Sequence, residues 1–161
     1  MEEIKGIDKL NELIKDVKIC MMITHDNNEI KGRPMATTAA TKDGVLWFFT
    51  SSSSEKYNEI LHDDQIALSY SDPSDNTYVI VNGTAAISRD KAKIKELWNP
   101  FVKAWFPDGI DDPHLVLIKV ELHKAEYWDS NSSSMVVFLH MLKSIVTGEQ
   151  YDEGEHGKIS L

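Results

Sequence analysis

The stretch RPMATTAATKDGVLWFFTSSSSEK, residues 33–56, decides the fold expected for this chain. It divides into two β-prone runs joined by Asp43-Gly44, a dipeptide typical of tight hairpin turns. The second run, Val45–Thr50, is short and apolar, which predicts a strand buried on both faces. Four serines then end the strand, and Ser52 with Glu55 three residues later has the spacing of a capping box. The stretch therefore predicts a hairpin followed directly by a helix.

The predicted helix start is a candidate anion site. Unpaired backbone N–H groups at a helix N-terminus, and the positive end of the helix dipole, favour a negatively charged ligand. Lys56 adds a full charge in the first turn, and Arg33 on the neighbouring strand adds a guanidinium that can bind two oxygens. Together these features predict a phosphate site. The sequence leaves an alternative open, in which the serines only cap the helix and Arg33 is solvated.

The composition is that of an ordinary globular protein. The chain has 161 residues, 42% of them hydrophobic and 27% charged, which predicts one domain with a sizeable core. The net charge of −9 disfavours nucleic acid, because phosphate backbones recruit basic surfaces. The one cysteine, Cys20, lies in an apolar run and allows no internal disulfide, which fits a reducing compartment. No signal peptide or membrane-spanning run is recognisable, so a cytoplasmic protein without a membrane partner is expected.

Outside the opening stretch, the patterns predict a mainly β (α+β) chain. Apolar residues at spacings of three and four predict a helix over 4–17, and further helices are expected after Asp90, around 101–106 and over 135–146. With the run at 45–50, the predicted strands number six, the others being 18–24, 30–41, 65–71, 77–88 and 116–129. Clustered strands with few crossover helices favour an antiparallel sheet closed into a barrel. We expect one domain over 1–148 and an acidic, weakly ordered tail over 149–161.

No metal site or catalytic constellation is predicted. The six histidines lie in six different segments without the close spacing of metal ligands. Asp108, Asp111 and Asp112 lack the alternating spacing of a calcium loop and are better explained as turn residues. The sequence therefore leaves the catalytic residues unknown.

Several motifs occur in an order that resembles a known family. Arg33-Pro34-Met35, Leu46–Thr50 and Ser54-Glu55-Lys56 are similar to the flavin site of the pyridoxamine 5'-phosphate oxidase-like proteins. Further landmarks are similar to the general stress protein branch of that family: Leu97–Pro100, Trp105–Gly109, Asp111–Pro113 and Glu126–Trp128. The resemblance implies a six-stranded split β-barrel with flanking helices, which binds flavin mononucleotide (FMN) between the two subunits of a homodimer.

The resemblance also implies which residues contact FMN. Arg33 would lie near the phosphate, together with Ser54 and Lys56 at the helix start, while Tyr78 and Trp128 would approach the flavin. The complete set of expected cofactor-binding residues is Arg33, Pro34, Met35, Ala36, Thr37, Phe49, Thr50, Ser54, Lys56, Tyr78 and Trp128.

Two departures from the family pattern bear on activity. Glu55 stands where the true oxidases have a second basic residue, and the chain has no Arg-x-His segment of the kind that holds the pyridoxal substrate. Both argue against vitamin B6 oxidation. The resemblance favours an FMN-dependent oxidoreductase of unknown small-molecule substrate, with NADH or NADPH as a transient electron donor. The alternative is a non-catalytic protein that stores or senses flavin or haem on the same barrel.

Overall fold

A computed structural model describes residues 2–129 and 155–161 of the chain. The elements are, in chain order, α1 (Glu2–Ile14), β1 (Ile19–Asp26), β2 (Glu29–Ala36), β3 (Ala39–Ala40), β4 (Val45–Ser51), α2 (Glu55–His62), β5 (Gln65–Asp72), β6 (Thr77–Ser88), α3 (Lys91–Leu97), α4 (Pro100–Trp105), the 3₁₀ helix η1 (Gly109–Asp111), β7 (Leu115–Asp129) and β8 (Glu155–Ser160). The helix predicted over 135–146 lies outside the described residues.

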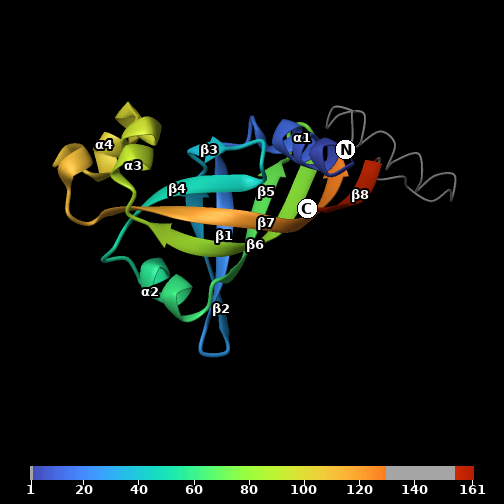
Figure 1. The fold of residues 1–161 in the computed structure, drawn as a ribbon. Helices are drawn as coiled ribbons and strands as arrows, with labels where there is room; N and C mark the ends of the chain where they lie inside the picture. Colours follow the sequence, from blue (N-terminus) through green and yellow to red (C-terminus); the bar gives the residue numbers. More distant parts are fainter. Residues whose placement is uncertain (1, 130–154) are drawn as a thin grey trace, which may run out of the picture.

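The strands form one antiparallel sheet in the order β2-β1-β5-β6-β7-β4-β3 (Figure 1). The long strand β7 pairs with β6 on one edge, and on the other edge with β4 along 115–121 and with β8 along 124–129. The mainly β, antiparallel prediction is confirmed. The sheet is not closed, however, because β2 and β3 end it as edge strands.

The described sheet has eight strands where the sequence predicted six. The run predicted as one strand over 30–41 is interrupted at Thr37-Thr38, so it forms β2 and the two-residue β3. The second extra strand, β8, lies within the tail that the sequence predicted to be weakly ordered. Residues 155–160 are ordered there by antiparallel pairing with β7.

Short-range turn chemistry fixes two of the hairpins, β1–β2 and β3–β4. Asn27 and Asn28 join β1 to β2 with φ of 48° and 71°, the backbone that a two-residue hairpin turn needs and that asparagine tolerates. Gly44 has a φ of 78° before β4, which confirms the Asp43-Gly44 hairpin. Pro34 lies on the edge strand β2, one of the places where a proline costs no ladder hydrogen bond.

Two hydrophobic clusters lie on opposite faces of the central strands. Phe48 belongs to the larger cluster, which α1 covers, and Trp47 to the smaller one, over which α3 and α4 pack. Figure 1 shows α1 at one end of the sheet and α3 and α4 at the other. Since side chains alternate between the faces of a strand, β4 supplies both clusters in turn, as its apolar run predicted.

No described helix has the length and hydropathy needed to cross a bilayer.

Candidate functional site

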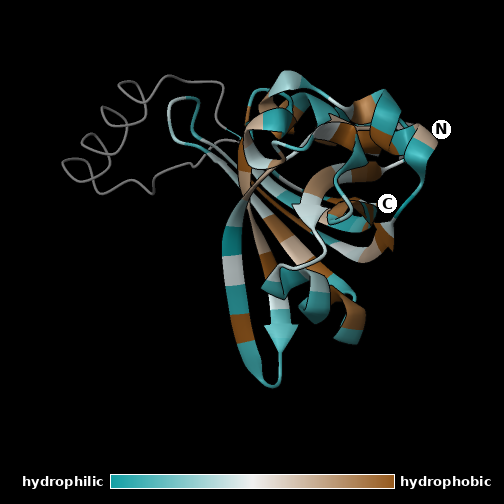
Figure 2. Ribbon diagram, turned by 90° about the vertical axis from the view of Figure 1, so that its left-hand side faces the viewer, coloured by the Kyte–Doolittle hydropathy of each residue, from teal (hydrophilic) through white to brown (hydrophobic). Residues whose placement is uncertain are grey.

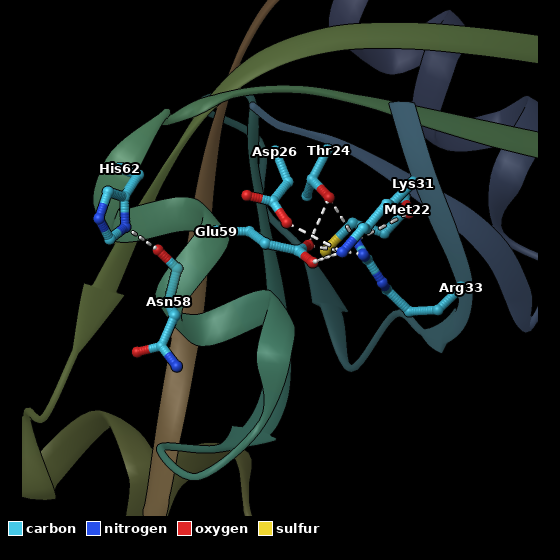
Figure 3. Close-up of polar contacts among 8 residues, drawn as sticks. All are labelled: Met22, Thr24, Asp26, Lys31, Arg33, Asn58, Glu59 and His62. Atoms are coloured by element: carbon cyan, nitrogen blue, oxygen red, sulfur yellow. Dashed lines mark hydrogen bonds and ion pairs between the residues drawn. The ribbon is translucent and has the colours of Figure 1, made fainter. Parts of the chain in front are cut away.

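Three contacts hold Arg33 against the inner side of the sheet (Figure 3). Its Nη2 lies 2.6 Å from Glu59 Oε2, and its Nη1 donates to Thr24 Oγ1 at 2.8 Å and to the Met22 carbonyl at 3.3 Å. The arginine side chain is only 20% exposed. The alternative of a solvated Arg33 is therefore wrong, because its charge is balanced by an acid from another element.

That acid, Glu59, is a site residue that the sequence analysis missed. It lies on α2, is 5% exposed, and accepts a second hydrogen bond from Thr24 Oγ1 at 2.6 Å. Its other oxygen, Oε1, has no hydrogen-bond partner among the described residues, and Lys31 Nζ approaches it at 3.8 Å. The feature of the sequence that could have indicated a buried Glu59 is its position beside Ile60 on the apolar face of the helix. Ile60 is 3% exposed, whereas Leu61, the next apolar residue, is 61% exposed.

Lys56 lies one turn before Glu59 on α2. It is half-buried, and burial lowers the pKa of its ammonium below 10.5, as does the nearby charge of Arg33, while Glu59 acts in the opposite direction. Glu59 forms its ion pairs with Arg33 and Lys31, and Lys56 forms none with any described residue. A partly dehydrated ammonium beside a second cation is an environment that a bound anion would stabilise.

The start of α2 differs from the predicted capping box. Ser54, not Ser52, is the N-cap residue, and its side chain makes no capping hydrogen bond because its hydroxyl donates to the Ser51 carbonyl at 2.7 Å. The Ser52 hydroxyl is 3.2 Å from His114 Nδ1 instead. The reason is that β4 runs on to Ser51, so the helix begins only at Glu55. The N-cap side chain therefore leaves the first-turn N–H groups free for a ligand.

Thr37 and Thr50, two further residues expected to contact the cofactor, each lie against another hydroxyl group. Thr37 Oγ1 lies 2.6 Å from the Tyr70 hydroxyl, and burial raises the pKa of Tyr70, which keeps the phenol neutral. Thr50 Oγ1 is 3.3 Å from Ser54 Oγ at the helix start. Burial also raises the pKa of the neighbouring Cys20 thiol, which is free and buried.

The other expected contact residues lie on different surfaces. Pro34 and Ala36 are exposed, on the face of β2 opposite to Arg33 and the buried Met35. Tyr78 and Trp128 pair directly across β6 and β7, and Tyr78 is 40% exposed.

Two of the expected aromatic residues already contact other rings. Trp128 stacks on His156 of β8, with the ring centroids 5.0 Å apart. Phe49 packs edge to face on Trp98 at 6.1 Å, within the smaller hydrophobic cluster.

The structure thus brings Arg33 close to Lys56, two of the residues that were predicted to bind the phosphate. It does not gather all eleven predicted cofactor-binding residues around one point. The cations Arg33, Lys56 and Lys31 face two carboxylates, Glu59 and Asp26, the latter 2.9 Å from Lys31. A third carboxylate, the exposed Glu55, also acts on Lys31, so what distinguishes Lys56 is that it forms no ion pair with any described residue at the uncapped helix start. These groups suit a phosphate monoester by charge and by donor type. In residues 2–129 and 155–161, no three His, Cys, Asp or Glu side chains are grouped as metal ligands.

Known proteins are similar to this chain in sequence. The family model described as "Pyridoxamine 5'-phosphate oxidase like" matches residues 5–152. Protein bli-3 of Neurospora crassa is 28% identical over 154 residues, which cover 89% of this chain and 74% of that protein.

Solved structures are similar in fold. A general stress FMN/FAD binding protein from Xanthomonas citri matches with a TM-score of 0.71 and 25% identity, covering 80% of this chain and 92% of that one. A protein from Clostridium acetobutylicum, described as related to general stress protein 26 of the pyridoxinephosphate oxidase family, matches with a TM-score of 0.69 and 23% identity over the same shares. The open antiparallel sheet with its flanking helices is therefore the fold of these proteins.

Proposed function

The chain belongs to the pyridoxamine 5'-phosphate oxidase-like family, and from this premise we propose that it binds FMN, with the phosphate at the subsite formed by Arg33, Lys56 and the start of α2. The observation that carries the proposal is Lys56, a half-buried ammonium beside Arg33 that has no ion-pair partner among the described residues. The Xanthomonas citri neighbour, described as an FMN/FAD binding protein, supports a flavin as the ligand.

The residues around this subsite have distinct tasks in the proposal. Lys56 supplies an ammonium that forms no ion pair with a described residue, Arg33 supplies paired N–H donors, and the uncapped N-terminus of α2 supplies backbone N–H groups. Glu55 is exposed at the first helical position, so its carboxylate can remain in water. Thr37 is fixed by Tyr70 next to the β2 segment that would run along the ring.

We propose further that the protein is an oxidoreductase acting on a small molecule, with NADH or NADPH as electron donor. A bound flavin would supply the electron transfer, and the chain would supply binding, orientation and exclusion of water. The test is a spectrum of the purified protein, followed by anaerobic addition of NADH or NADPH. Flavin absorbance that bleaches supports the oxidoreductase, flavin absorbance that persists supports a flavin-storing protein, and a haem spectrum contradicts FMN binding.

We also propose that two copies of the chain form the complete site. The outer face of the sheet carries exposed apolar side chains, Ile19 at 53%, Met21 at 43% and Tyr78 at 40%. Only β5 lies between their strands, β1 and β6, since Met21 pairs with Ser69 and Ser69 with Ile80, two residues from Tyr78. Figure 2 shows hydrophobic positions along the strands beside the β1–β2 hairpin, whose turn is hydrophilic. A second copy on this face would bring Tyr78 and Trp128 of one subunit toward the site of the other.

The dimer is tested by light scattering at micromolar concentration. We expect twice the mass of the 18.2 kDa chain, and we expect Met21→Lys to shift the population toward the monomer by placing a charge in an apolar interface. A monomeric wild-type protein at this concentration would contradict the proposal.

FMN affinity is expected to fall at alkaline pH. In the free protein the Lys56 pKa lies below 10.5, and a phosphate dianion favours the charged ammonium, so the pKa rises again on binding. Between these two pKa values binding takes up a proton, and the affinity therefore decreases as pH rises through that range. Titrations with riboflavin, which lacks the phosphate, control for ionisation of the ring. Lys56→Arg should remove the difference between the two ligands' pH profiles, because a guanidinium stays charged.

A further inference from the structure

The contacts of Arg33 leave one particular edge of its guanidinium free. A guanidinium has five N–H donors, and three are used here, two on Nη1 for Met22 and Thr24 and one on Nη2 for Glu59. Thr24 Oγ1 and Glu59 Oε2 are hydrogen-bonded to each other at 2.6 Å, so they close the edge between Nη1 and Nη2. The donors without a partner among the described residues are the Nε–H and the second N–H of Nη2, which are neighbours on the other edge.

The pair that closes the first edge is rigid. Thr24 is fully buried and Glu59 is 5% exposed, and they come from β1, the strand paired with that of Arg33, and from α2. Figure 3 shows the side chains of Thr24 and Glu59 converging on the end of Arg33. A buried carboxylate with one oxygen unbonded is costly to maintain, and packing alone would favour an apolar residue at this position.

From this arrangement we propose that Glu59 and Thr24 are positioning residues of the phosphate subsite, which hold Arg33 by one edge so that the Nε–H and Nη2–H fork faces the phosphate of the ligand. A fork held in advance matches two phosphate oxygens without the cost of ordering a long side chain on binding. The inference rests on the proposed function, because it names the residues that prepare that same site. Lys56 then supplies a charge that this pair does not neutralise directly.

The inference is tested with Thr24→Val and Glu59→Gln, which change shape little. FMN and riboflavin are titrated into each variant, with binding followed by quenching of flavin fluorescence. Each variant is expected to weaken FMN binding roughly three- to tenfold, the effect of a lost positioning hydrogen bond, and to leave riboflavin binding unchanged. In an Arg33→Ala background neither substitution should have a further effect, since both act through the arginine.

Three results would overturn the inference. Tighter FMN binding by Glu59→Gln would show that the carboxylate only opposes the phosphate charge. Equal losses for FMN and riboflavin would indicate general damage to the fold, and undiminished losses in the Arg33→Ala background would show that the pair acts by another route. If Glu59→Gln does not fold, Thr24→Val carries the test because it leaves all charges in place. A wild-type protein that binds neither flavin would refute the proposed function as well, whereas failure of the inference alone leaves wild-type FMN binding intact.

Discussion

Lys56→Met is expected to weaken FMN binding by roughly 10- to 150-fold, the equivalent of one charge-assisted hydrogen bond, while riboflavin binding changes much less. Methionine keeps the half-buried aliphatic stem and removes only the ammonium. The loss should be large because Lys56 makes no ion pair with any described residue, so that its charge is available to the ligand. Removal of a partly dehydrated cation also costs the free protein little.

The comparison of two ligands makes this measurement decisive. Fluorescence titrations of wild type and Lys56→Met with FMN and riboflavin separate a phosphate contact from general damage, which would weaken both ligands together. An unchanged FMN affinity would move the phosphate site elsewhere on the chain. Arg33→Ala should show a loss of similar size but is a less clean variant, because it leaves the buried Glu59 without its closest ion-pair partner.

Gly83→Ala is expected to destabilise the fold by roughly 2–3 kcal/mol, the cost of forcing an extra group into a packed site. A Cβ at this position would lie 2.6 Å from the Glu121 carbonyl oxygen and 2.8 Å from Val120 Cγ1. Gly83 sits where the register between β6 and β7 shifts, so neither strand can move away without loss of its neighbouring pairs. Gly83 therefore lies at a point where the register shifts and the two strands approach closely.

The matched control is Gly32→Ala on β2. The nearest atom to a Cβ there is Met21 Cε at 3.6 Å, an ordinary contact with the end of a flexible side chain. Its unfolding free energy should remain within about 0.5 kcal/mol of wild type. Thermal unfolding followed by circular dichroism gives both values, and we expect Gly83→Ala to lower Tm by roughly 5–10 °C. Equal effects of the two substitutions would contradict the steric argument.

The strands and turns of this protein were determined by the sequence at short range. The strand predicted over 77–88 matches β6 to the residue, and Asp43-Gly44 predicted a hairpin whose glycine has the required positive φ. Asp90 begins α3 as predicted, because its side chain accepts hydrogen bonds from two first-turn N–H groups. These features depend on neighbours within a few residues, so they can be predicted from the local sequence.

The candidate site depended on tertiary structure in several respects. The four serines predicted a helix start, yet Ser54 rather than Ser52 is the N-cap, since pairing with β7 extends β4 as far as Ser51. The segment over 155–160 has little strand character of its own and becomes β8 because β7 offers it an unpaired edge beyond β4.

Arg33 shows most clearly what could not be predicted from the sequence alone. Its spacing from Lys56 suggested a phosphate site, and the fold places the two charges near each other. The arginine is held by Glu59, which lies 26 residues away, and no sequence pattern paired these two residues. Side chains on β2 alternate between faces, so Arg33 points inward while Pro34 and Ala36 point outward. The period of two can be recognised in a sequence, but which face becomes the interior, and which distant charge lies against it, is decided only when the sheet folds and α2 packs on it.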